Sequence, residues 1–544
     1  MVSLIRQQVF GTVNERSNQM KEFVMTKTSP VVETKQGKLR GFSYDGVDHF
    51  YGIRYAVAER FHMPQPVPSW EGIKDAGSYG FICPVLNESA PAGEVMTPHR
   101  FWPASEHCQF LNVWTAGCDR SAKRPVVFWI HGGGFMSGSS IEQVSYDGFN
   151  LAKKDGLVVV SVNHRLNAFG YLDMSDFGEE YRNSVNVGMA DLVEALRWVK
   201  DNIAGFGGDP DNVTIFGQSG GGGKVTVLGQ IPEAEGLFHK MVLMSGVLPS
   251  STFDSGCTPK EFVLEILKNL NIEEKDAKKL EKVGVPQYIW AVNKAVRSMQ
   301  KQGKRVDWAP KPNDYYTCDP VDGEFSPSSL SKPTIVGNVI AEFAGPRDLG
   351  ERSSMSEEAQ KQFVLDTFGE EGGEKIIEAF RKAYPGKNLT YAADLDTMFL
   401  PATLEYVTKK AGKATAPVYN YQFAKVFDVD GGHAAWHCAD IPVIFHNSEL
   451  VPAYNQPHMD ELEKIMTGAF VAFARTGDPN GEGLPRWDPC TGDKVVTMVF
   501  DDQCETKTGL SDELLPLVKK YSKPFSFNFA SPKDDDEDRD SWIY

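Results

Sequence analysis

Four short runs of almost uninterrupted apolar residues limit the fold of this chain more than any other feature. They are "PVVFWI" (125–130), "GLVVVSVNHR" (156–165), "VTIFG" (213–217) and "HKMVLMSG" (239–246). A helix is expected at about 191–202, where apolar residues recur at spacings of three and four. Strands that are apolar on both faces and alternate with helices form parallel sheets covered by helices. The pattern therefore predicts an α/β fold with a central, mostly parallel β-sheet.

The rest of the chain predicts additions to this sheet within a single domain. Charged amphipathic helices are expected at about 255–310 and 355–415, and we interpret them as insertions over the sheet. A length of 544 residues would allow three or four domains of roughly 150 residues. Because the candidate catalytic residues run from 131 to 437, one large catalytic domain is the better prediction. The expected division is an N-terminal arm (1–28), the catalytic domain (29–530) and an acidic C-terminal tail (531–544).

Composition and charge narrow the partners and the location. A net charge of −17, most concentrated in "DDDEDRD" (534–540), repels nucleic acid and anionic membrane surfaces. The N-terminus lacks the apolar core of a signal peptide, and no apolar run approaches the length of a membrane-spanning helix. The eight cysteines show no CxxC spacing, which argues against zinc-ribbon and thioredoxin-like sites. We expect a cytoplasmic monomer or small homo-oligomer that binds neither nucleic acid nor membrane.

The segment "TIFGQSGGGGKV" (214–225) allows two interpretations. A phosphate-binding P-loop requires G-x-x-x-x-G-K-[ST], but the first glycine would fall on Gln218 and the final Ser/Thr on Val225. The alternative, G-x-S-x-G across residues 217–221, is a sharp strand-to-helix turn that projects the hydroxyl of Ser219. We therefore interpret the segment as a nucleophile elbow and Lys224 as a solvated helix residue.

A second glycine-rich turn, "HGGGFMSGSS" (131–140), directly follows an apolar run. Without side chains in the way, its backbone N–H groups can point into a site as an oxyanion hole. Each such donor typically contributes about 3–4 kcal/mol to a tetrahedral transition state. Either turn alone also fits a structural loop. Together, in the order HGGG and then G-x-S-x-G, they indicate acyl transfer through a serine, because each provides what the other's chemistry requires.

These motifs resemble the type B carboxylesterase family of α/β-hydrolases, including bacterial para-nitrobenzyl-type esterases. The resemblance covers nearly the whole chain in ordered blocks. The blocks are "VVETKQGKLRGF" (31–42), "FYGIRYA" (50–56), "SEHCQFLNVW" (105–114), "VNHRLNAFGYL" (162–172), "GFGGDPDNVTIFGQSGGG" (205–222) and "FARTGDPN" (473–480). The resemblance implies an α/β-hydrolase fold, helical insertions that form a cap around an active-site gorge, and carboxylic ester hydrolysis by a serine esterase.

The resemblance also implies a catalytic triad in the chain order Ser, acid, His. Ser219 takes the position of the nucleophile. The segment "TIVGNVIAEFAG" (334–345) places Glu342 at the acid position, although the surrounding letters depart from the family's pattern. Asp322 and Glu324 in "PVDGEFSP" are therefore alternative acids.

Several histidines compete for the role of base. The family's pattern falls on "HCADIPVIF" (437–445), which selects His437. We interpret His433 as a loop residue and His446 as lying beyond the site. His131 is expected to orient the backbone of the oxyanion loop. His107 and His164 are interpreted as structural.

The resemblance assigns oxyanion donation to the N–H groups of Gly133, Gly134 and Gly220. Gly220 replaces the alanine common in the family, a change that we expect the chemistry to survive. Ser245 and Gln218 are expected to support the triad without contacting the substrate, and Ser245 matches a serine that steadies the acid in the family. Two pairs match structural pairs of the family: Arg60 with Glu106 as an ion pair, and Cys83 with Cys108, which we expect to be reduced thiols here.

The expected substrate is a small to medium, uncharged alkyl or aryl ester. Cholinesterase-like relatives carry a glutamate before the nucleophile, whereas this chain has the neutral Gln218. Trp102, Phe135 and Phe343 are candidates for the pocket wall. The mechanism needs no metal or organic cofactor. The alternatives are amide or carbamate hydrolysis by the same triad, and a non-catalytic ligand-binding or adhesion role.

Overall fold

The computed structural model describes residues 23–24, 29–86, 97–248, 256–343, 352–429 and 431–522. The acidic tail and nearly all of the N-terminal arm lie outside these residues. The core is a sheet whose strands are, in spatial order, β1 (Phe23–Val24), β4 (Phe42–Tyr44), β5 (Val47–Arg54), β9 (Phe110–Thr115), β11 (Val158–Val162), β10 (Arg124–Ile130), β12 (Gly208–Gln218), β13 (Lys240–Met244), β14 (Thr334–Val339), β15 (Val418–Phe423), β18 (Val496–Phe500) and β19 (Glu505–Thr508).

The strands from β11 to β18 are parallel, and antiparallel strands flank them on both sides. Alternate residues of β10 enter different cores, because successive side chains of a strand point to opposite faces. Val127 and Trp129 pack on one face together with residues of α1 (Phe149–Lys153) and α12 (Met459–Thr476). The other face holds Phe128 and Ile130, with α3 (Val187–Asn202), α4 (Gly220–Leu228) and α10 (Phe399–Ala411). This three-layer arrangement confirms the predicted mostly parallel α/β fold.

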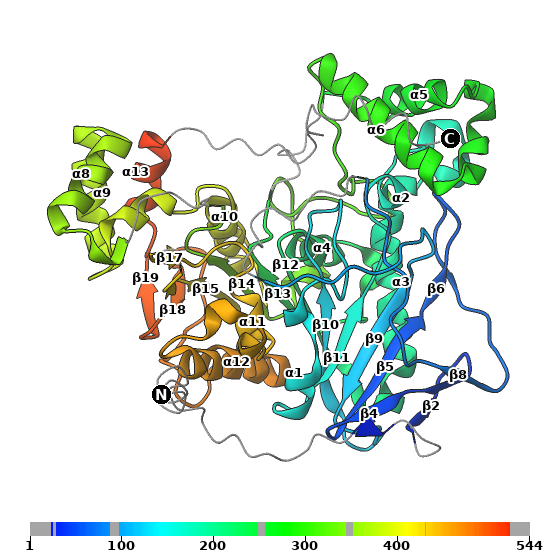
Figure 1. Ribbon diagram of the computed structural model, residues 1–544, viewed down its shortest axis with the longest axis horizontal. Helices are drawn as coiled ribbons and strands as arrows, with labels where there is room; N and C mark the ends of the chain where they lie inside the picture. The colour runs from blue at the N-terminus through cyan, green and yellow to red at the C-terminus, as the bar shows by residue number, and fades with distance from the viewer. Residues whose placement is uncertain are drawn as a thin grey trace, which may run out of the picture.

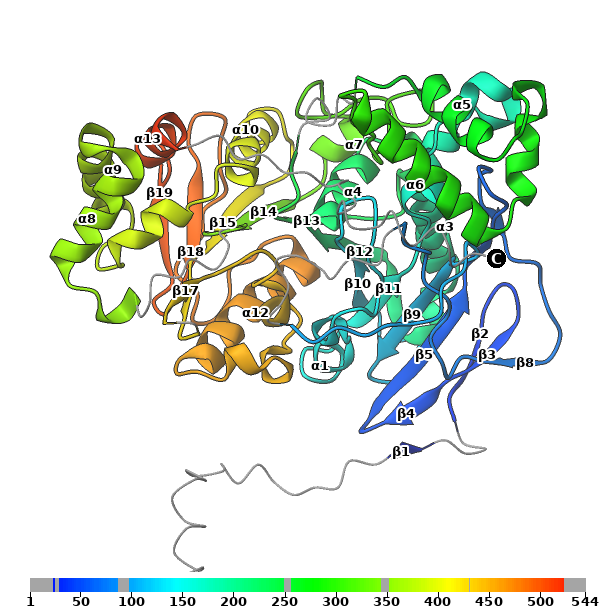
Figure 2. The same ribbon diagram turned by 45° about the horizontal axis from the view of Figure 1, so that its top comes forward.

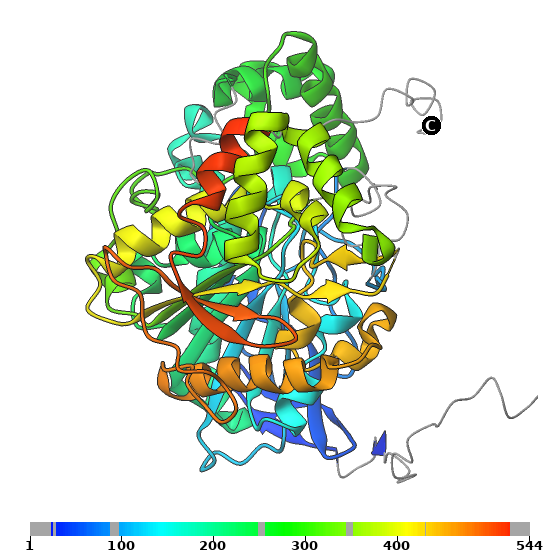
Figure 3. The same cartoon turned by 90° about the vertical axis from the view of Figure 1, so that its left-hand side faces the viewer.

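Further helices lie in both stretches where the sequence predicts insertions. The first holds α5 (Pro259–Asn269) and α6 (Val285–Lys301), and the second holds α8 (Glu357–Phe368) and α9 (Glu370–Ala383). Figure 2 shows these two groups at opposite ends of the molecule, with α13 (Leu514–Tyr521) beside α8 and α9. Figure 3 views the molecule from the side of α8 and α9, which lie above β18 and β19 in that view. Their role as a cap and the single catalytic domain remain predictions. Within the described residues, no helix is long and apolar enough to cross a bilayer.

The helix predicted at 191–202 begins earlier, at Val187. Its N-cap, Asn186, makes no side-chain capping bond, and Gly188 in the first turn is a weak helix former. The residue type at the N-cap is therefore favourable, but its side chain does not stabilise the helix start. The first turn is instead held by burial, since Val187, Gly188 and Met189 are all buried.

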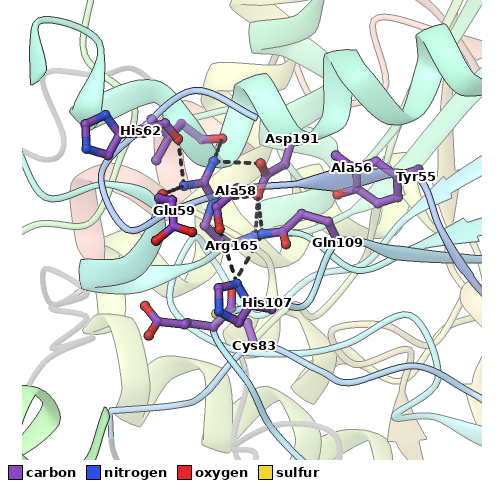
Figure 4. A network of polar contacts seen from close by, with 12 residues as sticks. Tyr55, Ala56, Ala58, Glu59, His62, Cys83, His107, Gln109, Arg165 and Asp191 are labelled. Atoms are coloured by element: carbon purple, nitrogen blue, oxygen red, sulfur yellow. Dashed lines mark hydrogen bonds and ion pairs between the residues drawn. The ribbon is translucent and has the colours of Figure 1, made fainter. Parts of the chain in front are cut away.

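A buried ion pair between Arg165 and Asp191 connects the segment 59–62 with α3 (Figure 4). Arg165 donates from Nε and Nη2 to the Asp191 carboxylate at 2.8 and 2.7 Å, and from Nη1 to the carbonyl oxygens of Glu59 and His62. Because the guanidinium and the carboxylate are both saturated with partners, the pair can be buried without an orphaned charge. Arg165 thereby fixes the chain that follows β11, next to the oxyanion loop.

Lys410 in α10 provides a pH-dependent stability term. Its Nζ donates to the hydroxyls of Ser329 and Thr334 at 3.2 and 2.8 Å, and burial lowers its pKa from 10.5 to about 7. Between about pH 7 and 10.5 the unfolded chain therefore binds a proton that the folded chain lacks, so this lysine makes stability rise with pH. We expect the stability of Lys410→Met relative to wild type to be greatest below pH 7 and to decline toward pH 10 in thermal melts. A difference that is constant across this range would contradict the assignment.

Candidate active site

Ser219 occupies the turn between β12 and α4, with φ 56° and ψ −127°. A non-glycine residue in such a conformation is strained by about 1–3 kcal/mol, and such strain clusters at functional sites. The N–H of Ser219 donates to the carbonyl of Met244 at 2.8 Å, which ties the turn to β13. A Cβ on Gly217 would lie 2.5 Å from the carbonyl carbon of Gly221, so only glycine lets α4 begin this close to the strand. The turn has the geometry of a nucleophile elbow.

The oxyanion loop, residues 131–138, follows β10 and lies against this turn. A Cβ on Gly132 would stand 3.3 Å from the Cβ of Ser219. Gly133 and Gly134 have φ values of 82° and 63°, in the left-handed region that glycine adopts freely. The two glycine-rich turns therefore lie side by side, with the predicted nucleophile next to the predicted donors.

His437 and Glu342 form a buried pair. The imidazole Nδ1 lies 2.6 Å from Oε2 of Glu342, and the His437 N–H donates to the Glu342 carbonyl at 2.7 Å. Burial raises the pKa of Glu342 to about 8, while the N–H of Val339 and the amide of Asn338 oppose this by donating to Oε1 at 3.1 and 3.4 Å. The Ser245 hydroxyl also favours the carboxylate, although its Oγ does not complete a well-formed hydrogen bond. An imidazolium on His437 would stabilise the charge on this desolvated carboxylate.

The imidazole is enclosed by side chains from separate parts of the chain. Phe343 lies 4.3 Å and Phe399 5.5 Å from it between ring centres. The amide nitrogen of Gln218, the residue before the nucleophile, stands 3.4 and 3.3 Å from the two ring nitrogens of His437. The Cys438 thiol in turn donates to the Gln218 amide oxygen at 3.1 Å. The elbow is thus in direct contact with the candidate base.

Two further buried carboxyl groups surround this pair and were missed by the sequence analysis. Burial raises the pKa of both Asp396 and Asp440 to about 7, and the nearby charge of Glu342 adds to each shift. Asp440 accepts a hydrogen bond from the Tyr421 hydroxyl at 2.6 Å. The acidic position in "HCADIPVIF" was a signal for Asp440, whereas no motif marks Asp396.

The Carboxylesterase family matches residues 28–515 of the chain. The chain belongs to this family. It is therefore a carboxylic ester hydrolase with the α/β-hydrolase fold.

Named relatives and solved structures agree with this membership. The para-nitrobenzyl esterase of Bacillus subtilis (strain 168) is 29% identical, covering 88% of this chain and 96% of that protein. Phenmedipham hydrolase of Pseudarthrobacter oxydans is 30% identical over the same shares. A solved esterase from anaerobic Clostridium hathewayi, described as able to hydrolyse aliphatic aromatic polyesters, is 46% identical, with a TM-score of 0.88, covering 92% of this chain and 100% of that one.

Gly220 stands where the family commonly has an alanine, and the structure of this carboxylesterase leaves no room for that methyl group. A Cβ on Gly220 would lie 2.0 Å from the carbonyl oxygen of Gly134, so the oxyanion loop has closed into the space that a methyl group would occupy. We expect Gly220→Ala to lower kcat by about 10- to 100-fold, because the loop must shift away from its donating position. Gly223→Ala is the matched control in the same helix, since its Cβ would meet no atom closer than 3.4 Å. Equal kcat values in steady-state assays of the two variants would contradict the expectation.

The structure separates the competing candidates from the pair. His433 bonds a neighbouring backbone carbonyl and His446 pairs with Asp155, so neither takes part in the site. Glu324 is exposed and pairs with Lys413. The ion pair of Arg60 with Glu106 is confirmed as bidentate, with both contacts at 2.8 Å.

The predicted pocket aromatics differ in their positions. Phe343 packs on His437, and Phe135 lies in the oxyanion loop against Tyr171. Trp102 is 38% exposed and packs on Tyr79, away from the residues of the pair. The described residues contain no group of three or more His, Cys, Asp or Glu side chains suited to hold a metal ion.

Lys224 was predicted to be solvated, and this was wrong: its side chain is completely buried. The helix that carries it is packed between the sheet and the oxyanion loop, so the fifth residue after Ser219 points inward. The cysteine pair is also buried, and Cys83 and Cys108 are both free thiols. Burial and the neighbouring Cys83 raise the pKa of Cys108 well above its usual range.

Proposed function

We propose that the enzyme hydrolyses esters through an acyl-enzyme on Ser219. His437 takes the proton of the Ser219 hydroxyl as the oxygen attacks the ester carbonyl, and Glu342 stabilises the imidazolium that forms. The N–H groups of Gly133, Gly134 and Gly220 receive the negative oxygen. His437 then protonates the departing alcohol.

The second half of the reaction repeats this chemistry with water. His437 removes a proton from a water molecule as its oxygen attacks the acyl carbonyl carbon and forms a second tetrahedral intermediate. The bond to the Ser219 oxygen then breaks, His437 returns the proton to that oxygen, and the acid leaves. The observation that carries the proposal is the 2.6 Å contact between Nδ1 of His437 and Glu342, on an imidazole that also touches the elbow. This contact fixes the ring so that Nε2 is the nitrogen left to exchange protons.

The proposed substrates are small to medium, uncharged alkyl and aryl esters. The aromatic rings of Phe343 and Phe399 beside His437 provide an apolar environment for the alcohol or acyl group. The neutral Gln218 offers no counter-charge to a quaternary ammonium group. The likeness to the Clostridium hathewayi enzyme, which is described as acting on aliphatic aromatic polyesters, supports uncharged acyl and aryl groups.

A comparison of two butyrate esters tests this substrate class. We expect kcat/KM for para-nitrophenyl butyrate to exceed that for butyrylcholine by at least about tenfold, since desolvating a cation without a counter-charge is unfavourable. Correction for the intrinsic reactivity of each leaving group comes from its alkaline hydrolysis rate. A corrected preference for the cationic ester would overturn the proposed class.

A further inference from the structure

Lys224 is a buried cation whose partners come from the oxyanion loop. It lies in the second turn of α4, five residues after Ser219, and is 0% exposed. Its Nζ donates to the carbonyl oxygen of His131 at 3.2 Å and stands 5.5 Å from the centre of the Phe135 ring. Among the described residues, no carboxylate lies within ion-pair distance of it.

Lys224 lies beside two buried histidines, His131 and His164, and of these three groups it is the one that can carry a positive charge. Burial lowers its pKa to about 7, opposed by the charges of Glu142 and Cys83. Burial, together with the charge on Lys224, lowers the pKa of both His131 and His164 well below the usual range, so these rings are neutral. An apolar side chain would be more stable at this position than an unpaired ammonium group.

The contact links two parts of the reaction site. The carbonyl of His131 belongs to the peptide that leads into Gly132 and the two predicted donor glycines after it. The start of α4 packs on the same stretch, since a Cβ on Gly221 would lie 2.0 Å from the carbonyl oxygen of Ile130. Lys224 therefore holds α4, the helix that begins directly after Ser219, against the first residues of the oxyanion loop. Its charge in this dry environment acts more strongly on a developing oxyanion than it would in water.

We propose that Lys224 is a positioning residue for ester hydrolysis, which holds the oxyanion loop through the His131 carbonyl and favours the negative tetrahedral intermediate by its charge. The inference rests on the proposed function of Ser219. Lys224 acts through the loop and does not touch the substrate.

Lys224→Met tests the proposal, because methionine keeps the length of the side chain and removes the donor and the charge. We expect kcat for para-nitrophenyl butyrate to fall by about 10- to 100-fold while KM changes by less than about threefold. The affinity for a trifluoromethyl ketone, which forms a tetrahedral adduct, should fall by the same factor as kcat/KM. The thermal midpoint should stay equal or rise, since a buried unpaired cation is lost. A role in folding alone would lower the midpoint and leave kcat per folded molecule unchanged, which would overturn the proposal.

Lys410→Met is the matched control, since Lys410 is equally buried and has a similarly lowered pKa of about 7. Its Nζ donates to the hydroxyls of Ser329 and Thr334, neither of which belongs to the oxyanion loop. The kcat of Lys410→Met should therefore equal that of wild type. If Lys224→Met does not fold, Lys224→Gln is measured in the same way with the same expectation. Wild-type kcat in the Lys224 variant, with Ser219→Ala inactive, would overturn only this inference. An active Ser219→Ala would overturn the proposed function itself.

Discussion

Ser219→Ala is expected to lower kcat for ester hydrolysis by about 10⁶-fold, the size of effect seen when a serine hydrolase loses its nucleophile. Alanine keeps the Cβ of the strained turn and removes only Oγ, so the fold should be unchanged. Residual hydrolysis should remain about 10³- to 10⁴-fold above the uncatalysed rate, because the oxyanion donors are still in place. The measurement is a progress curve with para-nitrophenyl butyrate at high enzyme concentration.

Ser331→Ala is the control for this experiment, since Ser331 is an exposed serine whose hydroxyl donates to the carbonyl of Ser328. Its kcat should match wild type, and both variants should share the wild-type thermal midpoint. Turnover by Ser219→Ala within a factor of about ten of wild type would contradict the assignment of the nucleophile.

Glu342→Gln is expected to lower kcat by about 10³- to 10⁴-fold. A neutral amide at 2.6 Å from Nδ1 of His437 cannot stabilise the imidazolium, and its NH₂ group can hold the wrong tautomer of the ring. KM should change little, because Glu342 does not contact the substrate in the proposed mechanism. Steady-state kinetics with purified, folded variant provide the measurement.

Glu324→Gln completes the comparison, because Glu324 was, with Asp322, one of the two alternative acids that the sequence left open. It lies exposed against Lys413, so its loss should leave kcat unchanged. A large loss in Glu324→Gln with little loss in Glu342→Gln would reverse the choice of acid.

The fold was predictable because the central strands are apolar on both faces, which indicates that both faces are buried. A run such as "PVVFWI" has no polar face, and the structure places it in the middle of the sheet with helices on both sides. The helix start at Val187 was not predicted, since Asn186 is followed by the weak helix former Gly188 and the apolar spacing becomes regular only later. Burial of the first turn determines that boundary.

The candidate site divides in the same way. Short-range motifs carried Ser219 and the oxyanion glycines, because a tight turn restricts neighbouring residues at fixed spacing. Phe399 reaches His437, and Asp396 comes near Glu342, only through folding, from a helix start with no recognisable pattern. The burial of Lys224 was missed because a lysine after a glycine run normally indicates a solvated helix face. Its inward position follows from the close packing of α4 against the oxyanion loop, which only the assembled structure reveals.

The most direct test of the account is to incubate the protein with a fluorophosphonate and to locate the adduct by peptide mass spectrometry. Only a serine activated by a neighbouring base reacts readily with this reagent. The account predicts a single adduct on Ser219 in wild type and none there in His437→Ala. An adduct on a different serine, or no adduct on the folded protein, would contradict it.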